Sequence, residues 1–353
     1  MKGFGVLKKG TVGWMEKPDP VCGHFDAIAR PVAIAPCTSD VHTAYEMDGP
    51  HLIDRILGHE CVGELIQVGA EVKDFKAGDT VVIPCITPSW RHPGIQDGLH
   101  QHEAGLLSGI NFSTYEDGTF ADRIKIRSAD MNLALLPVGM APETAVMLTD
   151  MMTTGFHGAE LSEIKFGDSV CVLGIGPVGL MAVAGSALSG AGKLFAVGSR
   201  PDCVALAKEY GATDTINYKE GNIYDQIMAA TGGVGVDVAI VAGGDLDTFY
   251  TAFGICKPGG NVTNINVFTE IPSFNIPIEY SGFGWLGHKT LRGGLCPGGR
   301  RRMERLLAIV QAGRVDPGKM ITHRFKGLES IPEAFQLMVN KPRDLIKPVV
   351  SFN

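Results

Sequence analysis

The sequence lacks the features that mark nucleic-acid-binding and membrane proteins. Lys and Arg together number 31 against 38 Asp and Glu, which gives a formal net charge of −7. Without an excess or a run of basic residues, the chain is a poor candidate for binding nucleic acid or an anionic membrane. No apolar stretch reaches the roughly 18 residues that a membrane-spanning helix needs. We therefore expect neither a nucleic acid nor a membrane as a partner.

Closely spaced cysteine pairs are also missing. The eight cysteines are scattered along 353 residues, and no two of them form a Cys-x-x-Cys pair. The segment from Met1 to Lys9 lacks the long apolar centre of a secretory signal peptide. Scattered cysteines in such a chain are typical of reduced thiols rather than of a disulfide framework. We therefore expect a cytoplasmic protein.

Glycine, by contrast, is abundant at 46 residues, and the length suits about two domains of roughly 150 residues each. Short Val- and Ile-rich segments predict mainly β-strands up to about residue 150. From about residue 154, apolar strands such as 169–173 and 236–241 alternate with helical segments. This alternation predicts a parallel sheet covered on both faces. The tail contains two amphipathic helices and a closing strand, 347–352, and we expect it to return to the first domain.

A glycine-rich turn follows the predicted strand 169–173 and opens a predicted helix. Its spacing is Gly174-x-Gly176-x-x-Gly179, and a dinucleotide-binding turn requires this strand–turn–helix context. Gly174 allows the tight turn, Gly176 lets a pyrophosphate approach the backbone, and Gly179 lets the helix pack on the strand. The helix N-terminus attracts the phosphates. The alternative is an ordinary strand–helix turn. The predicted cofactor-binding residues here are Gly174, Ile175, Gly176, Pro177, Val178 and Gly179.

The end of the second strand of this domain predicts the form of the cofactor. NAD sites place an Asp or Glu there to bind the ribose 2′-hydroxyl, whereas this sequence reads Gly198-Ser199-Arg200. A hydroxyl and a guanidinium suit a 2′-phosphate, and no carboxylate repels it. We therefore predict NADP(H), although Arg200 considered alone is typical of a solvated surface side chain. The remaining predicted cofactor-binding residues are Tyr218, Ile265, Asn266 and Val267.

Residues that suit a zinc ion occur in the first domain. Cys37, His59 and Glu60 offer a thiolate, an imidazole and a carboxylate, which are the ligand types that Zn²⁺ takes. Taken one at a time, a Cys or a His is more often a buried core residue than a ligand. The residues alone therefore leave both interpretations open.

The motifs together resemble those of the zinc-containing medium-chain alcohol dehydrogenases. Within that family, the sequence is most similar to the tetrameric NADP-dependent secondary-alcohol dehydrogenases of anaerobic bacteria and protozoa. The resemblance implies an α/β protein with a β-rich GroES-like catalytic domain, formed by residues 1–153 and 295–353. It also implies a Rossmann domain with a doubly wound parallel sheet, residues 154–294, for the cofactor. The segments that carry the resemblance are 36–40, 58–72, 149–158, 174–179, 197–200 and 293–299.

The resemblance also implies the zinc ligands. Cys37, His59 and Asp150 are the expected ligands of one catalytic zinc ion, and Asp150 stands where most of the superfamily has a cysteine. A carboxylate oxygen is an acceptable zinc ligand. Glu60 is expected as a fourth ligand in some states or as a neighbouring anion.

Two further residues resemble the family's proton relay in catalysis. Ser39 corresponds to its relay hydroxyl, and His42 is expected to pass the proton to solvent because imidazole titrates near neutral pH. His42 considered alone is typical of a surface histidine. Asp40 is expected either to orient His42 or His59, or to cap a helix.

The predicted activity is zinc-assisted hydride transfer between NADP(H) and short secondary alcohols or ketones, with aldehydes as secondary substrates. A homotetramer is implied by the resemblance. One alternative is a zinc polyol dehydrogenase on the same fold. Another is a zinc-independent NADPH-binding protein such as a quinone reductase, in which Cys37, His59 and Asp150 would be incidental.

The sequence predicts a single tightly held zinc ion per chain. Many zinc alcohol dehydrogenases have four closely spaced cysteines for a structural zinc near residues 90–115, where this chain has none. A closed structural site needs four Cys or His ligands at short spacing. Metal analysis of the purified protein is therefore expected to find one tightly held zinc per chain, and two would contradict the prediction.

Overall fold

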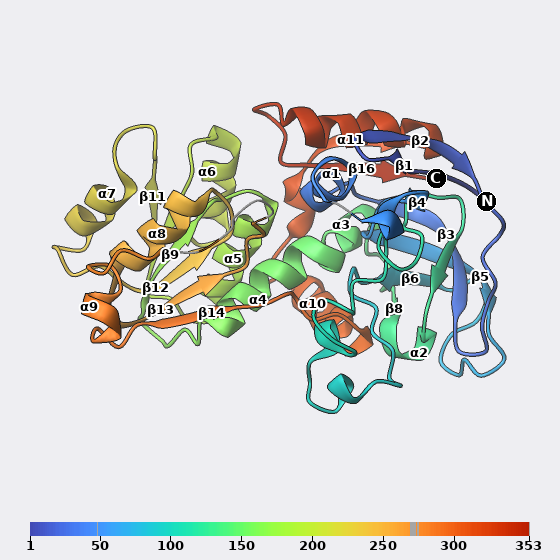
Figure 1. Ribbon diagram of the computed structural model, residues 1–353, viewed down its shortest axis with the longest axis horizontal. Helices are drawn as coiled ribbons and strands as arrows, with labels where there is room; N and C mark the ends of the chain where they lie inside the picture. The colour runs from blue at the N-terminus through green and yellow to red at the C-terminus, as the bar shows by residue number, and fades with distance from the viewer. Residues whose placement is uncertain (48, 269–272, 274, 353) are drawn as a thin grey trace. The chain divides into compact units, whose positions relative to one another are not determined.

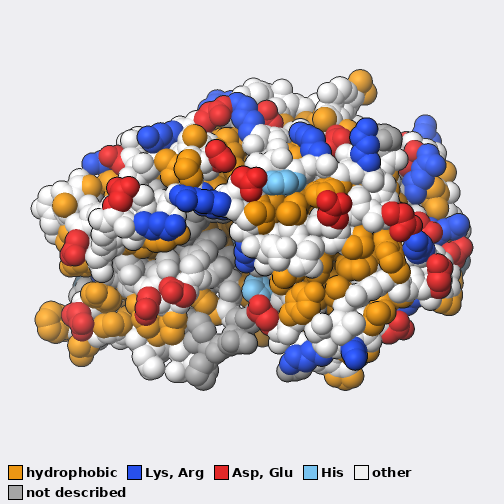
Figure 2. Space-filling view, turned by 90° about the horizontal axis from the view of Figure 1, so that it is seen from above, with side chains coloured by type: hydrophobic (Ala, Val, Ile, Leu, Met, Phe, Trp, Pro, Cys, Tyr) orange, Lys and Arg blue, Asp and Glu red, His pale blue; other side chains and the backbone are white. Residues whose placement is uncertain are grey.

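The computed structural model describes residues 1–47, 49–268, 273 and 275–352 (Figure 1). The chain forms two compact units, Met1–Thr153 with Cys296–Asn353, and Thr154–Leu295. None of the described helices is long and apolar enough to cross a membrane. On the face drawn in Figure 2, acidic and basic side chains are interspersed. This face therefore has no large field of one sign.

The first unit is built on a seven-stranded sheet that contains strands from both of the unit's chain segments. The closing strand β16 (Lys347–Ser351) pairs antiparallel with β3 (Ala27–Ile34). The sheet order is β15 (Ile321–Lys326), β16, β3, β5 (Cys61–Val68), β6 (Thr80–Ile83) and β8 (Ala134–Leu135), and β7 (Ile124–Ile126) also pairs with β3. A three-stranded sheet has the order β2 (Thr11–Glu16), β1 (Lys2–Lys8) and β4 (Arg55–Ile56).

Helices of the first unit cover these sheets and shape the loops between them. Phe335 of α11 (Ile331–Asn340) packs edge-on against Phe4 of β1, with ring centroids 5.8 Å apart, and both rings are buried in one apolar core. In the described chain, residues 87–119 contain two short 3₁₀ turns but no α-helix or extended strand. The other helices are α1 (Thr38–Tyr45), α2 (Ala129–Asn132), α3 (Pro142–Val146) and α10 (Arg300–Gln311).

The second unit is a six-stranded sheet in which every pairing is parallel. The strands lie in the order 3-2-1-4-5-6 when numbered along this unit, which is the order of a dinucleotide-binding fold. The strands in that spatial order are β11 (Asp214–Ile216), β10 (Lys193–Val197), β9 (Ser169–Leu173), β12 (Val236–Val241), β13 (Cys256–Asn264) and β14 (Thr290–Gly293).

Both faces of this sheet are buried, because its strands are apolar at successive positions. Cys171 and Leu173 of β9 share one core with Phe249 and Phe253 of α8 (Leu246–Ile255). The intervening Val170 and Val172 are also fully buried, and side chains at alternate positions point to opposite faces. The prediction of a parallel sheet covered on both faces is therefore confirmed. The remaining helices of this unit are α4 (Thr153–Leu161), α5 (Pro177–Leu188), α6 (Pro201–Glu209), α7 (Ile223–Ala230) and α9 (Gly282–Trp285).

One strand boundary differs from the sequence-based expectation. The apolar pattern of the sequence predicts a strand at 261–266, whereas β13 begins at Cys256 and stops at Asn264. Its register against β12 shifts after Cys256, so the first part of the strand is irregular and its Pro–Gly–Gly sequence hid it. Ile265, Asn266 and Val267 therefore lie beyond the strand, in the loop that follows it.

Gly179 provides a test of how tightly α5 packs on the turn. A Cβ atom at this position would lie 1.8 Å from the carbonyl oxygen of Gly174, so Gly179→Ala must displace backbone. We expect a loss of about 1–3 kcal/mol in the free energy of unfolding, the usual cost of overpacking. Gly185→Ala in the same helix is the control, because its nearest contact would be 3.2 Å from the Cβ of Ala159. Equal losses in urea denaturation would contradict this account.

Candidate active site

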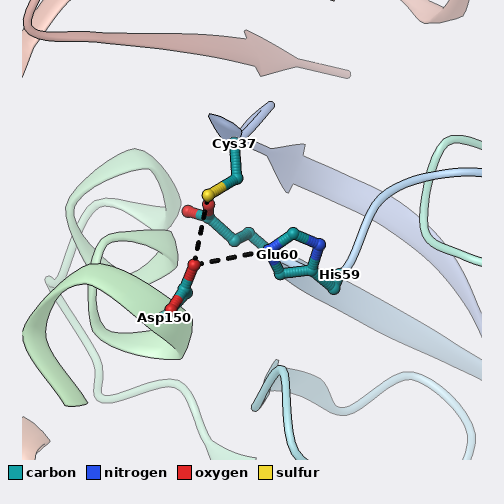
Figure 3. Close-up of side chains that lie close together, drawn as sticks. All are labelled: Cys37, His59, Glu60 and Asp150. Atoms are coloured by element: carbon teal, nitrogen blue, oxygen red, sulfur yellow. Dashed lines mark hydrogen bonds and ion pairs between the residues drawn. The ribbon is translucent and has the colours of Figure 1, made fainter. Parts of the chain in front are cut away.

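Four side chains that can bind a metal converge in the first unit (Figure 3). Cys37, His59, Glu60 and Asp150 each offer a ligand atom, and these atoms all lie within 4.8 Å of one another. Cys37 is the N-cap of α1, and His59 and Glu60 come directly before β5. Asp150 lies in a π-helical turn, Leu148–Met152, which leads into α4. Such turns are rare and occur frequently at functional sites.

The separations between these atoms fit tetrahedral coordination of zinc. The Sγ of Cys37 lies 3.4 Å from Oδ2 of Asp150, and Nε2 of His59 lies 3.3 Å from the same oxygen. Zn–S and Zn–N or Zn–O bonds of about 2.3 Å and 2.0–2.1 Å at tetrahedral angles place sulfur and oxygen about 3.5 Å apart, and nitrogen and oxygen about 3.3 Å apart. The donor set and its spacing therefore suit Zn²⁺.

Asp40 fixes the imidazole of His59. Its Oδ1 lies 3.1 Å from Nδ1 of His59 and also accepts the N–H of Gly58 at 3.0 Å. Its Oδ2 accepts the N–H of Cys37 at 2.8 Å, which completes a capping box at the start of α1. Asp40 thus both orients His59 and caps the helix, two alternatives that the sequence left open. A carboxylate on Nδ1 leaves Nε2 available for a metal.

The electrostatics of the site favour exchange of protons for a cation. Burial alone would lower the pKa of His59, but the charge of Asp40 and hydrogen bonds to Asp150 and Asp40 outweigh it and hold this pKa well above its ordinary value. Burial also raises the pKa of the Cys37 thiol. Both groups therefore retain protons that a metal must displace, so metal affinity rises with pH.

Glu60 forms a buried ion pair with Lys347. Its Oε1 lies 2.5 Å from Nζ of Lys347, and both side chains are almost inaccessible to solvent. Its Oε2 is buried and has no hydrogen-bond partner among the residues that the structure describes. Burial raises the pKa of Glu60 to about 7, against the opposing effect of the Lys347 ammonium. The unpartnered oxygen is suited to a metal, while the other oxygen stays with Lys347.

The sequence interpretation missed Lys347. It opens the apolar closing strand β16, and a lysine at a strand end is usually solvated. Its partner lies 287 positions away, so nothing local in the sequence signals the pair.

The two predicted relay residues lie in different surroundings. Oγ of Ser39 is 3.2 Å from Nε2 of His59, so the structure brings Ser39 to the metal-binding cluster. Nδ1 of His42 instead pairs with the carboxylate of Glu46, one turn further along α1.

The glycine turn of the second unit has the backbone that the sequence predicts. Gly174 has a φ of +88°, and a Cβ there would lie 2.9 Å from the backbone of Gly243. Gly176 is the N-cap of α5 and Pro177 its first residue. A Cβ placed on Gly176 would lie 4.0 Å from a guanidinium nitrogen of Arg200, and no described residue beyond its chain neighbours and its own helix would come closer. The turn is thus open at Gly176, with Arg200 beside it.

The other predicted cofactor residues follow the carboxyl ends of neighbouring strands. Ser199 and Arg200 come after β10, and Tyr218, about half exposed, comes after β11. Beyond β13, the N–H of Ile265 donates to the carbonyl of Val241, and Asn266 Nδ2 to that of Gly244. Val267 is exposed. Because the strands are parallel, these segments lie at the edge of the sheet where such folds bind nucleotides.

Comparison with known proteins identifies the family. Residues 23–137 match the alcohol dehydrogenase GroES-like domain, and residues 177–312 match the zinc-binding dehydrogenase domain. The chain belongs to the zinc-binding alcohol dehydrogenase family.

Several relatives of this dehydrogenase are similar over their whole length. The NADP-dependent isopropanol dehydrogenase of Thermoanaerobacter brockii is 57% identical over 99% of both chains, and that of Clostridium beijerinckii is 53% identical over 99% of both. Among solved structures, alcohol dehydrogenase TADH from Thermus sp. ATN1 covers 100% of both chains with a TM-score of 0.86 and 27% identity. The predicted family, the GroES-like and Rossmann architecture and the classification as an enzyme are confirmed.

The ion pair of Glu60 with Lys347 provides a stability test for the dehydrogenase. Lys347→Met leaves the Glu60 carboxylate buried without its partner, and we expect a loss of about 3–5 kcal/mol in the free energy of unfolding. The double variant Lys347→Met with Glu60→Gln is expected to recover much of this loss. Denaturant unfolding with zinc content held equal measures both.

The exposed pair of Arg30 and Glu64, 2.8 Å apart on neighbouring strands, provides the matched control. Arg30→Met is expected to cost less than about 1 kcal/mol. Strictly additive effects of the Lys347 and Glu60 substitutions would show that the two side chains do not interact.

Proposed function

We propose that this dehydrogenase interconverts short secondary alcohols and ketones with NADP(H), and that aldehydes are secondary substrates. The observation that carries the proposal is the donor set of Cys37, His59 and Asp150, spaced as tetrahedral zinc requires. The isopropanol dehydrogenases that are 53% and 57% identical over nearly the whole chain support the substrate class and the cofactor.

In this proposal Cys37, His59 and Asp150 hold the zinc ion. When bound, zinc acts as a Lewis acid that polarises a ketone oxygen or lowers the pKa of an alcohol. Asp40 keeps Nε2 of His59 directed at the ion, through the contact with Nδ1. Glu60 keeps one oxygen on Lys347 and offers the other as a fourth ligand or as a neighbouring anion.

The proposed proton route begins at Ser39. Its hydroxyl is exposed on one side and contacts His59 on the other, which suits a group that accepts a proton from the substrate and releases it outward. His42 remains a prediction as the next member. Since Nδ1 of His42 faces Glu46, a proton would pass through Nε2.

The cofactor proposal rests on the turn at 174–179 and on Arg200. The N-terminus of α5 offers backbone N–H groups to the pyrophosphate. Arg200 lies beside Gly176, and no carboxylate stands at positions 197–200. This combination favours a 2′-phosphate over a free 2′-hydroxyl.

The alternatives account for less of the structure. A zinc-independent reductase has no use for Cys37, His59 and Asp150 at ligand spacing. A zinc polyol dehydrogenase shares the metal set, so only its substrates distinguish it. Oxidation of sorbitol in preference to 2-propanol would favour the polyol activity.

The proposal includes a homotetramer located in the cytoplasm. The resemblance to tetrameric secondary-alcohol dehydrogenases supports the assembly, and the eight cysteines, all free thiols, suit a reducing compartment. Sedimentation of the purified protein measures the number of chains.

The central experiment follows nicotinamide absorbance with NADP⁺ and 2-propanol, before and after chelation of zinc. Reduction of NADP⁺ is expected, together with its loss on chelation and its recovery on return of zinc. Asp150→Ala is expected to lose both activity and zinc, because a ligand is removed. Asp97→Ala, at an exposed loop aspartate of the same unit, is the control. Full activity and full zinc content in Asp150→Ala would remove Asp150 from the ligand set.

Cofactor preference provides an independent test. Arg200→Gln is expected to weaken NADPH binding by roughly 10- to 100-fold, the value of a charge-assisted hydrogen bond, and to leave NADH binding unchanged. Lys208→Gln, at an exposed position of the same helix α6, is the matched control. Fluorescence titration measures the affinities, and an equal effect on both cofactors would contradict a role for Arg200 at the 2′-phosphate.

A further inference from the structure

Two buried cysteines outside the proposed ligand set lie in contact. Cys85 follows β6, Cys296 precedes α10, and their sulfur atoms are 3.7 Å apart. Only 6% of Cys85 and 2% of Cys296 are exposed. The proposed reaction assigns a role to neither thiol.

A carboxylate completes this pair. One oxygen of Asp150 lies within 4.8 Å of both sulfur atoms, so that Cys85, Cys296 and Asp150 form a second group of possible ligands. The hydrogen bond with Cys296 and burial raise the pKa of Cys85, and the negative charges of Asp150 and Glu60 add to this effect. Three ligands of this kind leave a fourth position open for water.

The distance between the sulfur atoms distinguishes a metal from a disulfide. Two thiolates on one tetrahedral zinc, each at about 2.3 Å, lie about 3.8 Å apart. A disulfide bond is about 2.05 Å long, so forming one would require the sulfur atoms to approach by roughly a further 1.6 Å. The observed 3.7 Å matches the metal geometry without any displacement.

We propose that Cys85, Cys296 and Asp150 form a second, weaker site for a thiophilic divalent cation such as Zn²⁺ or Cd²⁺. The cation replaces the two thiol protons, which leave to solvent, and no electron transfer is involved. Binding is weaker than at the first site because this group offers three ligand residues, against four in the first group. Because Asp150 belongs to both groups, its carboxylate would be shared by the two cations, and the first would stay in place.

The proposal goes beyond the alcohol dehydrogenase function and does not depend on it. It is also compatible with one tightly held zinc per purified chain, since the second site fills only when the cation is in excess.

Titration of the zinc-loaded enzyme with Cd²⁺ tests the site. Thiolate-to-cadmium charge-transfer absorption in the ultraviolet reports on the sulfur ligands, and metal analysis counts bound cadmium and retained zinc. We expect one additional cadmium per chain, full retention of zinc and release of about two protons per cadmium. Cys85→Ala and Cys296→Ala are each expected to weaken cadmium binding by about 100-fold or more. Loss of a residue that only hydrogen-bonds to a metal ligand already lowers metal affinity by about 10–100-fold.

Control variants separate this site from other thiols. Cys203→Ala removes a buried cysteine of α6 in the other unit and is expected to leave the titration unchanged. Serine variants at Cys85 and Cys296 repeat the comparison with a smaller change in volume, and retained zinc shows that the first site is intact. Cadmium uptake that equals zinc loss, or that is unchanged in the Cys85 and Cys296 variants, would overturn the proposal.

Discussion

The carboxylate of Asp40 is the interaction on which the candidate active site depends. It accepts the backbone N–H groups of Cys37 and Gly58 and contacts Nδ1 of His59. Cys37 and His59 belong to separate segments, one at the start of α1 and one before β5, and a single buried side chain joins them. Three hydrogen bonds to one carboxylate in a region of low dielectric are strong and directional. These bonds fix the positions of the Cys37 thiol and the His59 imidazole. Asp150, from a different segment, completes the donor set.

Other elements of the first unit position Asp150 beside the cluster and bring the positive charge of Lys347 to Glu60. The π-helical turn at Leu148–Met152 directs Asp150 toward the cluster, and β16 brings Lys347 to Glu60 from the other end of the chain. Because β16 pairs with β3, the lysine arrives on a strand whose register is set by the sheet. The first unit therefore needs its last strand to complete the site. The segment Cys296–Asn353, separated by more than 140 residues from Thr153, belongs to the same unit for this reason.

The parts of this structure that could be predicted from sequence are those encoded locally. Gly174, Gly176 and Gly179 follow an apolar strand and open a helix. Gly174 and Gly179 have no room for a Cβ, whereas the turn is open at Gly176. The resemblance to a known family supplied Asp150, whose position in a π-helical turn no periodicity indicates. The role of Lys347 could not be predicted from the sequence. Lys347 reaches its partner Glu60 only because β16 pairs with β3 in the folded sheet. The strand β14 was also missed, because it is only four residues long and pairs only with β13.

Charge balance connects the two groups of possible metal ligands. Around the first, the carboxyl groups of Asp40, Glu60 and Asp150 lie with two basic groups, Lys347 and His59. If Zn²⁺ replaces the protons of His59 and Cys37, the formal charge stays the same, so the cation enters without building up charge in a buried region. The same exchange is proposed for Cys85 and Cys296. Loss of their two thiol protons would be balanced by the charge of one divalent cation. In both proposed sites the ligand spacing decides where a divalent cation can bind, and Asp150 lies where the two groups meet.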